Sequence, residues 1–214
     1  MSFELWLFAV KRLAQTMDAA QLIYDGLSDA DKERLKKEYD EFIAGGAGAE
    51  EKEPEVSVRK FSDKDLTQMI KIWNEVVEEG IAFPQEDILD IFSAKKLFKS
   101  QSYVGVAESD GKIVGLYILH PNNVGRCGHI CNASFAVSSK MRGKHIGEKL
   151  VLDCISKASE LGFLILQFNA VVETNTHARH LYERLGFMRL GIIPGGFRMK
   201  DGHYENICPY YRVL

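Results

Sequence analysis

The stretch VSSKMRGKHIGEKL, residues 137–150, places arginine, glycine, lysine, histidine and glycine directly before a run with the apolar spacing of an amphipathic helix over 146–161. The first N–H groups of a helix have no acceptor within the helix, and the helix dipole adds partial positive charge at that end. We therefore expect this helix start to bind an anion, with the backbone at Gly143 kept open for close approach.

Composition and charge limit the possible functions. The chain has 214 residues, 46% hydrophobic and 27% charged, enough for one sizeable core and an appendage. Its formal net charge of -3 argues against nucleic acid as a partner. No segment approaches the roughly 18 apolar residues of a membrane span, and the N-terminus lacks secretory-signal features. The four cysteines lie in apolar runs without a disulfide spacing, which is typical of a reduced, cytoplasmic protein.

Two regions are expected along the chain: a helical extension with its linker over 1–50, and a main domain over 51–214. Apolar residues recur at helical intervals over 2–24, and Ser28 with Asp31 resembles a capping box for a second helix that continues to about residue 42. The acidic, glycine-rich stretch 45–54 has the composition of a flexible linker. Two short helices bury little surface alone, so we expect them to pack on the main domain or on a second subunit.

The main domain alternates between strand and helix patterns, and SDGK at 109–112 is typical of a hairpin turn. This order predicts an α/β protein of the α+β type, with a mixed sheet of about seven strands flanked by helices rather than a doubly wound sheet. The expected strands cover 56–61, 103–108, 113–119, 130–137, 163–169, 187–193 and 205–214, and the expected helices cover 63–79, 85–98, 146–161 and 174–185.

A second motif, NTHARHLYERLGF, occupies residues 175–187. With the first stretch, it resembles the GNAT superfamily of acyl-CoA-dependent N-acyltransferases, over about residues 56–214. The resemblance implies the GNAT fold, and the second signature (Asn, two residues, Ala, two, Leu-Tyr, three, Gly-Phe) is matched in full. The pyrophosphate loop departs from the family at Lys140, where Gln or Arg is usual, and at His145, where a small residue is usual. We expect a helical backbone, and therefore little strain, at His145.

The resemblance implies acetyl-CoA as the co-substrate, in a mechanism that needs no metal. Backbone N–H groups of the loop, namely those of residues 142–145 and 147, are expected to converge on the pyrophosphate. The strand ending at residues 135–137 is expected to offer backbone groups to the pantetheine arm, where it parts from the strand over 163–169. The expected coenzyme-binding residues are Phe135, Val137, Arg142, Gly143, Lys144, His145, Gly147, Glu148, Asn175 and Tyr182.

Two residues of the second motif have an expected chemical role. By the resemblance, Tyr182 lies near the thioester sulfur, where its phenol can donate a proton to the departing thiolate. Asn175 begins the same helix and can cap it by accepting a backbone N–H. The family adds a hydrogen bond from Asn175 to the coenzyme or to its ordered water.

A closer similarity lies in HPNNVGRCGHICNASFAV at 120–137 and LQFNAVVETN at 166–175. Both are similar to the GNAT subgroup that acetylates proline analogues such as azetidine-2-carboxylate and hydroxyproline. The matching asparagines imply substrate binding by Asn132 and a catalytic role for Asn169. An amide can orient a carboxylate or stabilise an oxyanion, but it is not an efficient base at neutral pH. A buried amide that satisfies strand ends is the structural alternative for both.

The general base is left open by the sequence. The acceptor amine can lose its proton to water or to a side chain near the cleft, and the candidate side chains are Glu108, Glu173 and His203.

Two other residue sets are interpreted as core. Cys127, His129 and Cys131 have the spacing that would place them on one strand face, but no fourth metal ligand recurs nearby. One or two of the following aromatics are expected to face the acceptor and the others to pack inside: Phe61, Trp73, Phe83, Phe92 and Phe98.

The sequence therefore predicts an N-acetyltransferase that acts on the amino group of a small metabolite, an amino or imino acid, by direct attack through a tetrahedral intermediate. A noncatalytic acyl-CoA sensor or interaction module is an alternative, because the phosphate loop alone would suffice for binding. A protein lysine acetyltransferase is a third hypothesis, and the absence of glutamate from 130–137 argues against it. The resemblance and the apolar extension also suggest a homodimer, without nucleic-acid or membrane partners.

Overall fold

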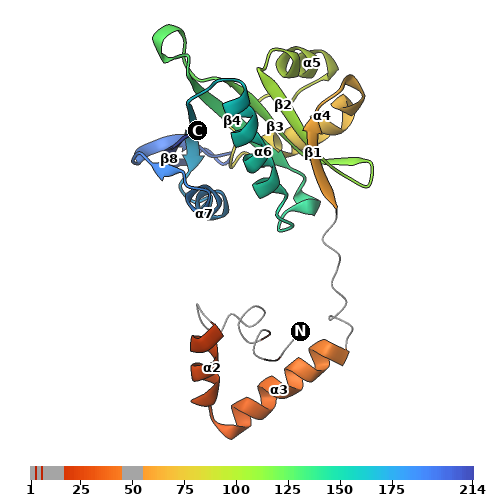
Figure 1. Cartoon of the computed structure of the whole chain (residues 1–214), viewed down its shortest axis with the longest axis vertical. Helices are drawn as coiled ribbons and strands as arrows, with labels where there is room; N and C mark the ends of the chain where they lie inside the picture. Colours follow the sequence, from red (N-terminus) through yellow and green to blue (C-terminus); the bar gives the residue numbers. More distant parts are fainter. Residues whose placement is uncertain (1–2, 4–5, 7–16, 45–54) are drawn as a thin grey trace. The chain divides into compact units, whose positions relative to one another are not determined.

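The computed structural model describes residues 3, 6, 17–44 and 55–214 (Figure 1). The chain divides into two compact units, Met1–Glu53 and Pro54–Leu214. Most of the helix expected over 2–24 and the whole linker at 45–54 lie outside the described residues. None of the helices in the described ranges has the length and apolarity that a bilayer crossing requires.

In the first unit, α2 (Met17–Asp25) and α3 (Asp29–Ala44) are joined by a short turn. The Ser28 hydroxyl accepts a hydrogen bond from the Asp31 N–H at 3.2 Å and donates one to its carboxylate at 2.6 Å, so α3 begins where the capping pattern predicts. Six of the described side chains in this unit form a small apolar cluster, which contains Phe3, Trp6, Tyr24, Leu27, Leu35 and Tyr39.

The second unit contains one mixed sheet of eight strands in the order β1-β2-β3-β4-β5-β8-β6, with β7 beside β8. All neighbouring strands are antiparallel except β4 and β5, which are parallel. The expected mixed α/β fold is therefore confirmed. The strands are β1 (Val56–Lys60), β2 (Tyr103–Ser109), β3 (Lys112–Pro121), β4 (Ile130–Val137), β5 (Ile165–Val172), β6 (Met188–Arg189), β7 (Ile193–Arg198) and β8 (Tyr204–Val213).

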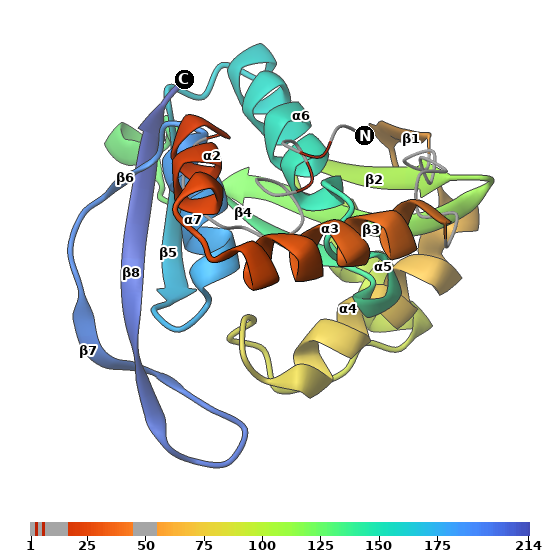
Figure 2. The same ribbon diagram turned by 90° about the horizontal axis from the view of Figure 1, so that it is seen from below.

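Helices cover both faces of the sheet. One core lies between the sheet, α6 (Ile146–Glu160) and α7 (Thr176–Arg184), and it contains Tyr117, Leu150 and Phe168. The other lies between the sheet, α4 (Leu66–Glu79) and α5 (Ile91–Lys99), and it contains Trp73 and Phe98. Figure 2 shows α6 on one side of β2 and β3, and α4 and α5 on the other. Successive strand residues therefore enter different cores.

The helix expected from residue 85 begins only at Ile91. The Asp90 side chain caps it by accepting the N–H of Ser93 at 2.7 Å. Before that, the Asn74 amide of α4 forms two hydrogen bonds with the backbone of Leu89, at 2.8 and 2.9 Å. These bonds hold the segment before Asp90 in an irregular conformation, which periodicity in the sequence does not predict.

Two strand predictions also change. The strand expected over 187–193 is shortened to β6, and β7, which begins at Ile193 and continues to Arg198, is an eighth strand that the sequence did not predict. β5 continues to Val172, beyond the expected end at residue 169, because Val171 and Val172 pair with Cys208 and Ile207 of β8. The expected hairpin at 109–112 is confirmed, with positive φ at Asp110 (49°) and Gly111 (72°).

The parallel pair at the centre of the sheet is short. β4 and β5 are paired only at Ile130–Ile165, Cys131–Leu166 and Asn132–Gln167. Beyond these residues β4 pairs with β3 alone, and β5 pairs with β8 alone. We call the parting that begins after Asn132 and Gln167 the β4–β5 fork.

Candidate active site

The fork leaves backbone groups of β4 without a neighbouring strand. The Ile130 carbonyl accepts a hydrogen bond from the segment after β3 at 2.8 Å, and the Ser138 N–H donates one to a β3 carbonyl at 3.0 Å. Because backbone groups alternate in direction along a strand, the even-numbered residues of β4 point to β3. Phe135 and Val137 therefore direct their N–H and C=O groups into the fork. This is the place where the sequence analysis predicts the pantetheine arm of the coenzyme.

The loop before α6 is rich in free donors. No acceptor in the described part of the chain takes the N–H groups of residues 143–148, and the first α6 bond runs from Lys149 N–H to His145 O at 3.2 Å. Gly143 has φ of 78°, and a Cβ built on it would meet no atom within 4 Å. These consecutive donors, at the start of a 15-residue helix, form a binding site suited to the oxygen atoms of a pyrophosphate.

Unlike the N–H groups of residues 143–148, the backbone N–H of Arg142 has an acceptor among the described residues. Its N–H donates to the Ser139 carbonyl at 3.4 Å, and its guanidinium forms an ion pair with Glu79 of α4 at 2.8 Å. The Ser139 hydroxyl donates to Glu75, also on α4, and this bond lowers the pKa of the Glu75 carboxyl. Two carboxylates of α4 therefore hold the first part of the loop.

The expectation for His145 is wrong. Its backbone has φ of 55° and ψ of 13°, in the left-handed region, and not the helical conformation predicted. The residue lies one position before α6, at the N-cap of the helix. A left-handed backbone costs an L-residue about 1–2 kcal/mol, which gives a physical reason for glycine at this position.

Glu148 lies in the first turn of α6, where the helix dipole favours negative charge. Both of its carboxylate oxygens accept hydrogen bonds from Arg184 of α7, at 2.6 and 2.9 Å, and this contact lowers the pKa of Glu148. Sequence reasoning missed Arg184, because its position in the second motif accepts any residue. Its charge offsets that of Glu148 beside the expected phosphate site.

Tyr182 packs against the aromatic residues on the α6 and α7 side of the sheet. Its ring centroid is 4.5 Å from that of Phe168 and 5.7 Å from that of Phe187. Phe168 in turn lies 5.7 Å from Phe135, so rings from both arms of the fork meet here. Burial raises the pKa of Tyr182 well above its usual value, and its hydroxyl forms no hydrogen bond with any described residue. The phenol is therefore protonated and available as a donor.

Asn175 caps α7 as predicted. Its side-chain oxygen accepts the N–H of Ala178 at 3.2 Å. The side-chain NH2 group has no acceptor among the described residues, so it is available to a ligand.

Asn132 and Asn169 lie on the opposite face of the sheet from Tyr182. Their strand neighbours Cys131, Leu166 and Phe168 belong to the core beneath α6, so the intervening residues face the α4 side. Asn132 is half-buried, whereas Asn169 is exposed. The alternative of a buried amide is therefore wrong for Asn169.

Asn169 belongs to a group of side-chain amides that the sequence analysis did not predict to lie together. Its Nδ2 donates to Asn122 Oδ1 at 2.7 Å, and its Oδ1 accepts from Gln167 Nε2 at 2.9 Å. We call Asn122, Asn132, Gln167 and Asn169 the amide cluster. The alternation of Gln167 and Asn169 along β5 could have indicated from the sequence that both face the same side. Nothing in the sequence indicated that Asn122, in the segment after β3, is their partner.

The structure places two of the candidate bases away from the fork. Glu108 lies on β2, separated from the fork by β3 and β4, and it accepts a hydrogen bond from Arg59 Nε at 2.6 Å. His203 lies in the turn before β8, where hydrogen bonds first to Asp201 and then to Glu205 raise its pKa and favour the charged form. The Glu173 carboxylate, just beyond β5, accepts from Asn206 at 2.7 Å.

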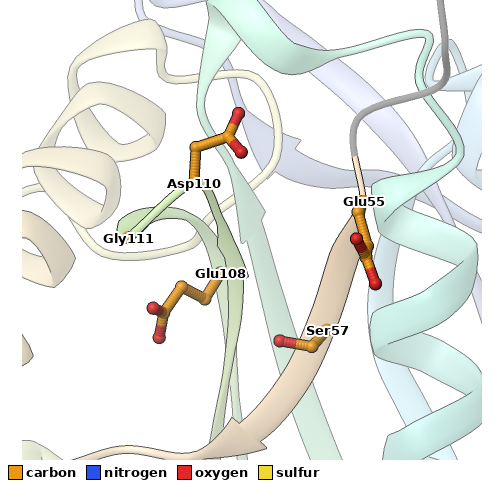
Figure 3. A pocket seen from close by; sticks show the side chains of 5 residues that line it. All are labelled: Glu55, Ser57, Glu108, Asp110 and Gly111. Carbon is orange, nitrogen blue, oxygen red and sulfur yellow. The ribbon is translucent and has the colours of Figure 1, made fainter.

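A hollow at the edge of the sheet does not belong to the fork. It is lined by Glu55, Ser57, Glu108, Asp110 and Gly111. Figure 3 shows Ser57 on β1, Glu55 just before this strand, and the other three residues on the β2–β3 hairpin. None of the residues of the two motifs contributes to it, and its three carboxylates are unsuited to a phosphorylated ligand.

The remaining core assignments change in part. Cys127 is exposed in a 3-10 turn and not on β4, so it does not share a strand face with Cys131. Within the described residues, no three His, Cys, Asp or Glu side chains form a group able to hold a metal. Phe92 is 81% exposed and therefore outside the core, whereas Trp73 and Phe83 are in contact, with ring centroids 4.6 Å apart. Phe61 and Phe98 also belong to the core beneath α4.

Comparison with known proteins identifies the family. Residues 66–187, more than half of the chain, match the acetyltransferase (GNAT) family. The chain belongs to this family. The match includes the loop before α6 and ends at Phe187, the last residue of the second motif. The superfamily expected from the two motifs is thus confirmed.

Individual GNAT relatives agree with this assignment. N-acetyltransferase aca1 of Schizosaccharomyces pombe is 43% identical over 98 residues, which are 46% of this chain and 46% of that protein. The match thus spans about half the length of this curated relative. A GCN5-related N-acetyltransferase from Kribbella flavida has a TM-score of 0.70 and 33% identity, over 74% of this chain and 98% of that one. A phosphinothricin acetyltransferase from Sinorhizobium meliloti, at 21% identity, has the same fold, with a TM-score of 0.70 over 74% of this chain and 88% of that one.

The left-handed backbone at His145 leads to a stability prediction. His145→Gly should be more stable than His145→Val by about 1–2 kcal/mol, because glycine adopts this conformation freely and a β-branched residue does not. Thermal or urea unfolding of the two variants measures the difference. Equal stabilities, or a less stable glycine variant, would contradict the observed conformation.

The open space at Gly143 leads to a binding prediction. Gly143→Glu should bind acetyl-CoA at least about 10-fold more weakly than Gly143→Ala, because both side chains strain the same backbone but only glutamate brings negative charge to the phosphates. Isothermal titration calorimetry of both variants, with thermal unfolding as a folding control, tests this. Similar affinities would show that the phosphates bind elsewhere.

Proposed function

We propose that this protein transfers the acetyl group of acetyl-CoA to the amino group of a small amino or imino acid. The observation that carries the proposal is the β4–β5 fork, which is lined by free backbone groups of Phe135 and Val137. Tyr182 lies on one face of the sheet at this point, and the amide cluster lies on the other. A thioester in the fork would meet a proton donor from one side and an amine from the other.

The coenzyme end of the site follows from the free donors before α6. The N–H groups of residues 143–148 would bind the pyrophosphate, and the exposed Lys144 would add a screened attraction. The NH2 group of Asn175 is a further donor to the coenzyme. The similar phosphinothricin acetyltransferase was solved in complex with acetyl-CoA, which supports the choice of ligand.

Tyr182 would act on the leaving group. Burial keeps its phenol protonated, and no described residue accepts its proton, so the hydroxyl can donate to the thiolate as the carbon–sulfur bond breaks. Its ring is held by Phe168 and Phe187, so the hydroxyl is positioned before the substrate binds.

The amide cluster would bind the acceptor. Asn132 and Gln167 are the last paired residues before the fork opens, and Asn169 is the second residue beyond it on β5. Their amides can donate to a substrate carboxylate, and Asn169 can also stabilise the oxyanion. The cluster contains no carboxylate that would attract a long cationic chain, which favours an amino or imino acid over a polyamine or a protein lysine. We include proline analogues, since Asn132 and Asn169 match the subgroup that acetylates them, and we propose a cytoplasmic location.

A screen of amine substrates tests the function. The protein is incubated with acetyl-CoA and, one at a time, amino acids, proline analogues, polyamines and lysine peptides, and free thiol release is followed with mass spectrometry of the products. Acetylation of amino or imino acids is expected. Tight acetyl-CoA binding without any turnover would favour a noncatalytic sensor, and turnover of lysine peptides alone would favour a protein acetyltransferase.

Replacement of the leaving-group acid should affect turnover more than binding. Tyr182→Phe keeps the ring contacts but removes the donor, so kcat should fall by about 100-fold while acetyl-CoA affinity stays nearly the same. Steady-state kinetics and calorimetry measure the two effects. Tyr204→Phe, at an exposed tyrosine at the start of β8, is the matched control. An unchanged kcat would remove Tyr182 from the mechanism.

Replacement of the acceptor amide should affect the acceptor alone. Asn132→Ala should raise the KM of the acceptor about 10-fold through the loss of one hydrogen bond, and should leave acetyl-CoA binding unchanged. Titration of each substrate in turn separates the effects, with Asn123→Ala in the exposed segment after β3 as the control. A change in acetyl-CoA affinity with no change for the acceptor would contradict the assignment.

A further inference from the structure

A row of polar residues crosses the sheet at the base of the fork. In the strand register, His120 of β3 pairs with Asn132 of β4, Asn132 pairs with Gln167 of β5, and Gln167 pairs with Tyr211 of β8. Directly paired residues lie on the same face of a sheet, so all four side chains are on the α4 side. His120 is thus one strand away from the fork, beside the proposed acceptor amide Asn132.

The hydrogen bonding of His120 determines which ring nitrogen carries the proton. Its Nδ1 is 3.0 Å from the carbonyl oxygen of Pro121. A carbonyl can only accept, so Nδ1 is the donor and Nε2 of the neutral ring has a free lone pair. No described residue donates to Nε2, and the side chain is half-buried, so the ring is oriented but its basic nitrogen is unoccupied.

The groups that surround His120 do not supply another base. Asn132, Gln167 and the nearby Asn122 are neutral amides, and no ion pair in the described part of the chain includes His120. Arg126 and His129 in the segment before β4 are exposed. Charged side chains on other elements have partners of their own: Glu79 pairs with Arg142, Glu86 with Arg198, Lys99 with Asp63 and His203 with Asp201. Glu75 accepts a hydrogen bond from the Ser139 hydroxyl, and Glu173 accepts one from Asn206.

We propose that His120 is the catalytic base that deprotonates the acceptor. This inference rests on the proposed function and identifies the base of the same site. Neighbouring strands are about 4.8 Å apart, so Nε2 is within reach of an amine held by Asn132, directly or through one water. An imidazole exchanges a proton near neutral pH, which an amide cannot do.

The proton balance of the reaction is complete with two residues. The acceptor ammonium gives one proton to His120 Nε2, and the neutral amine attacks the thioester carbonyl to form the carbon–nitrogen bond. The carbon–sulfur bond then breaks, Tyr182 protonates the departing thiolate, and the proton lost from the new amide nitrogen returns to the tyrosinate through water. The imidazolium releases its proton to solvent, so each turnover yields the amide, free coenzyme A and one proton.

The proposal is tested by the pH dependence of kcat/KM for the acceptor. It is measured from about pH 6 to about pH 9, the range in which imidazole and amine groups titrate. His120→Gln should lower kcat/KM about 100-fold near neutral pH and should lose the imidazole part of the acidic limb. Added imidazole should restore part of the rate of His120→Ala. His129→Gln, at an exposed histidine before β4, is the matched control and should behave as the unmodified protein.

The outcomes separate this inference from the function on which it rests. Acetyl-CoA binding and thermal unfolding confirm that each variant is folded. A rate for His120→Gln equal to that of the unmodified protein, or a lower rate with an unchanged pH profile and no rescue by imidazole, would overturn the role as base while the acetyltransferase function stands. Failure of the unmodified protein to acetylate any amine would overturn both.

Discussion

The site depends on one limit in backbone hydrogen bonding, the end of the β4–β5 pairing after Asn132 and Gln167. β5 is held on its other side by β8 as far as Val172, so it follows β8 and leaves β4. Backbone N–H and C=O groups that lose a strand partner require another acceptor or donor. The N–H and C=O groups of Phe135 and Val137 are therefore available to a ligand. In a longer β4–β5 pair they would have formed hydrogen bonds with β5.

The pleat of the sheet separates two chemical environments around this fork. Odd-numbered residues of β4 enter the aromatic core beneath α6 and α7, where burial keeps the Tyr182 phenol protonated. Even-numbered residues face α4, where Asn132 lies beside amides from β5 and from the segment after β3. Tyr182 and the amide cluster are thus close to the same fork but on opposite faces of the sheet, so the phenol does not form a hydrogen bond with the amides.

The loop before α6 is supported by both helical layers. α4 holds its first part through the pairs of Glu79 with Arg142 and of Glu75 with Ser139, and α7 holds the first turn of α6 through the contact of Arg184 with Glu148. Between these supports the N–H groups of residues 143–148 have no acceptor, and His145 has a left-handed backbone. The contacts at both ends oppose the strain at His145 and orient the free donors before any anion binds.

The sequence by itself determined the family, the mixed sheet, the strand limits of β4 and the capping role of Asn175, because these depend on periodicity and on short local motifs. It also named Gly143, Tyr182, Asn132 and Asn169, since each lies within a recognisable stretch. Only the tertiary structure decided the conformation of His145, the late start of α5 and the pairing of Arg184 with Glu148, because each depends on contacts between distant segments. The same holds for His120: the register of β3 on β4 places it beside Asn132, the register of β4 on β5 places both at the base of the fork, and no local pattern in the sequence contains these registers.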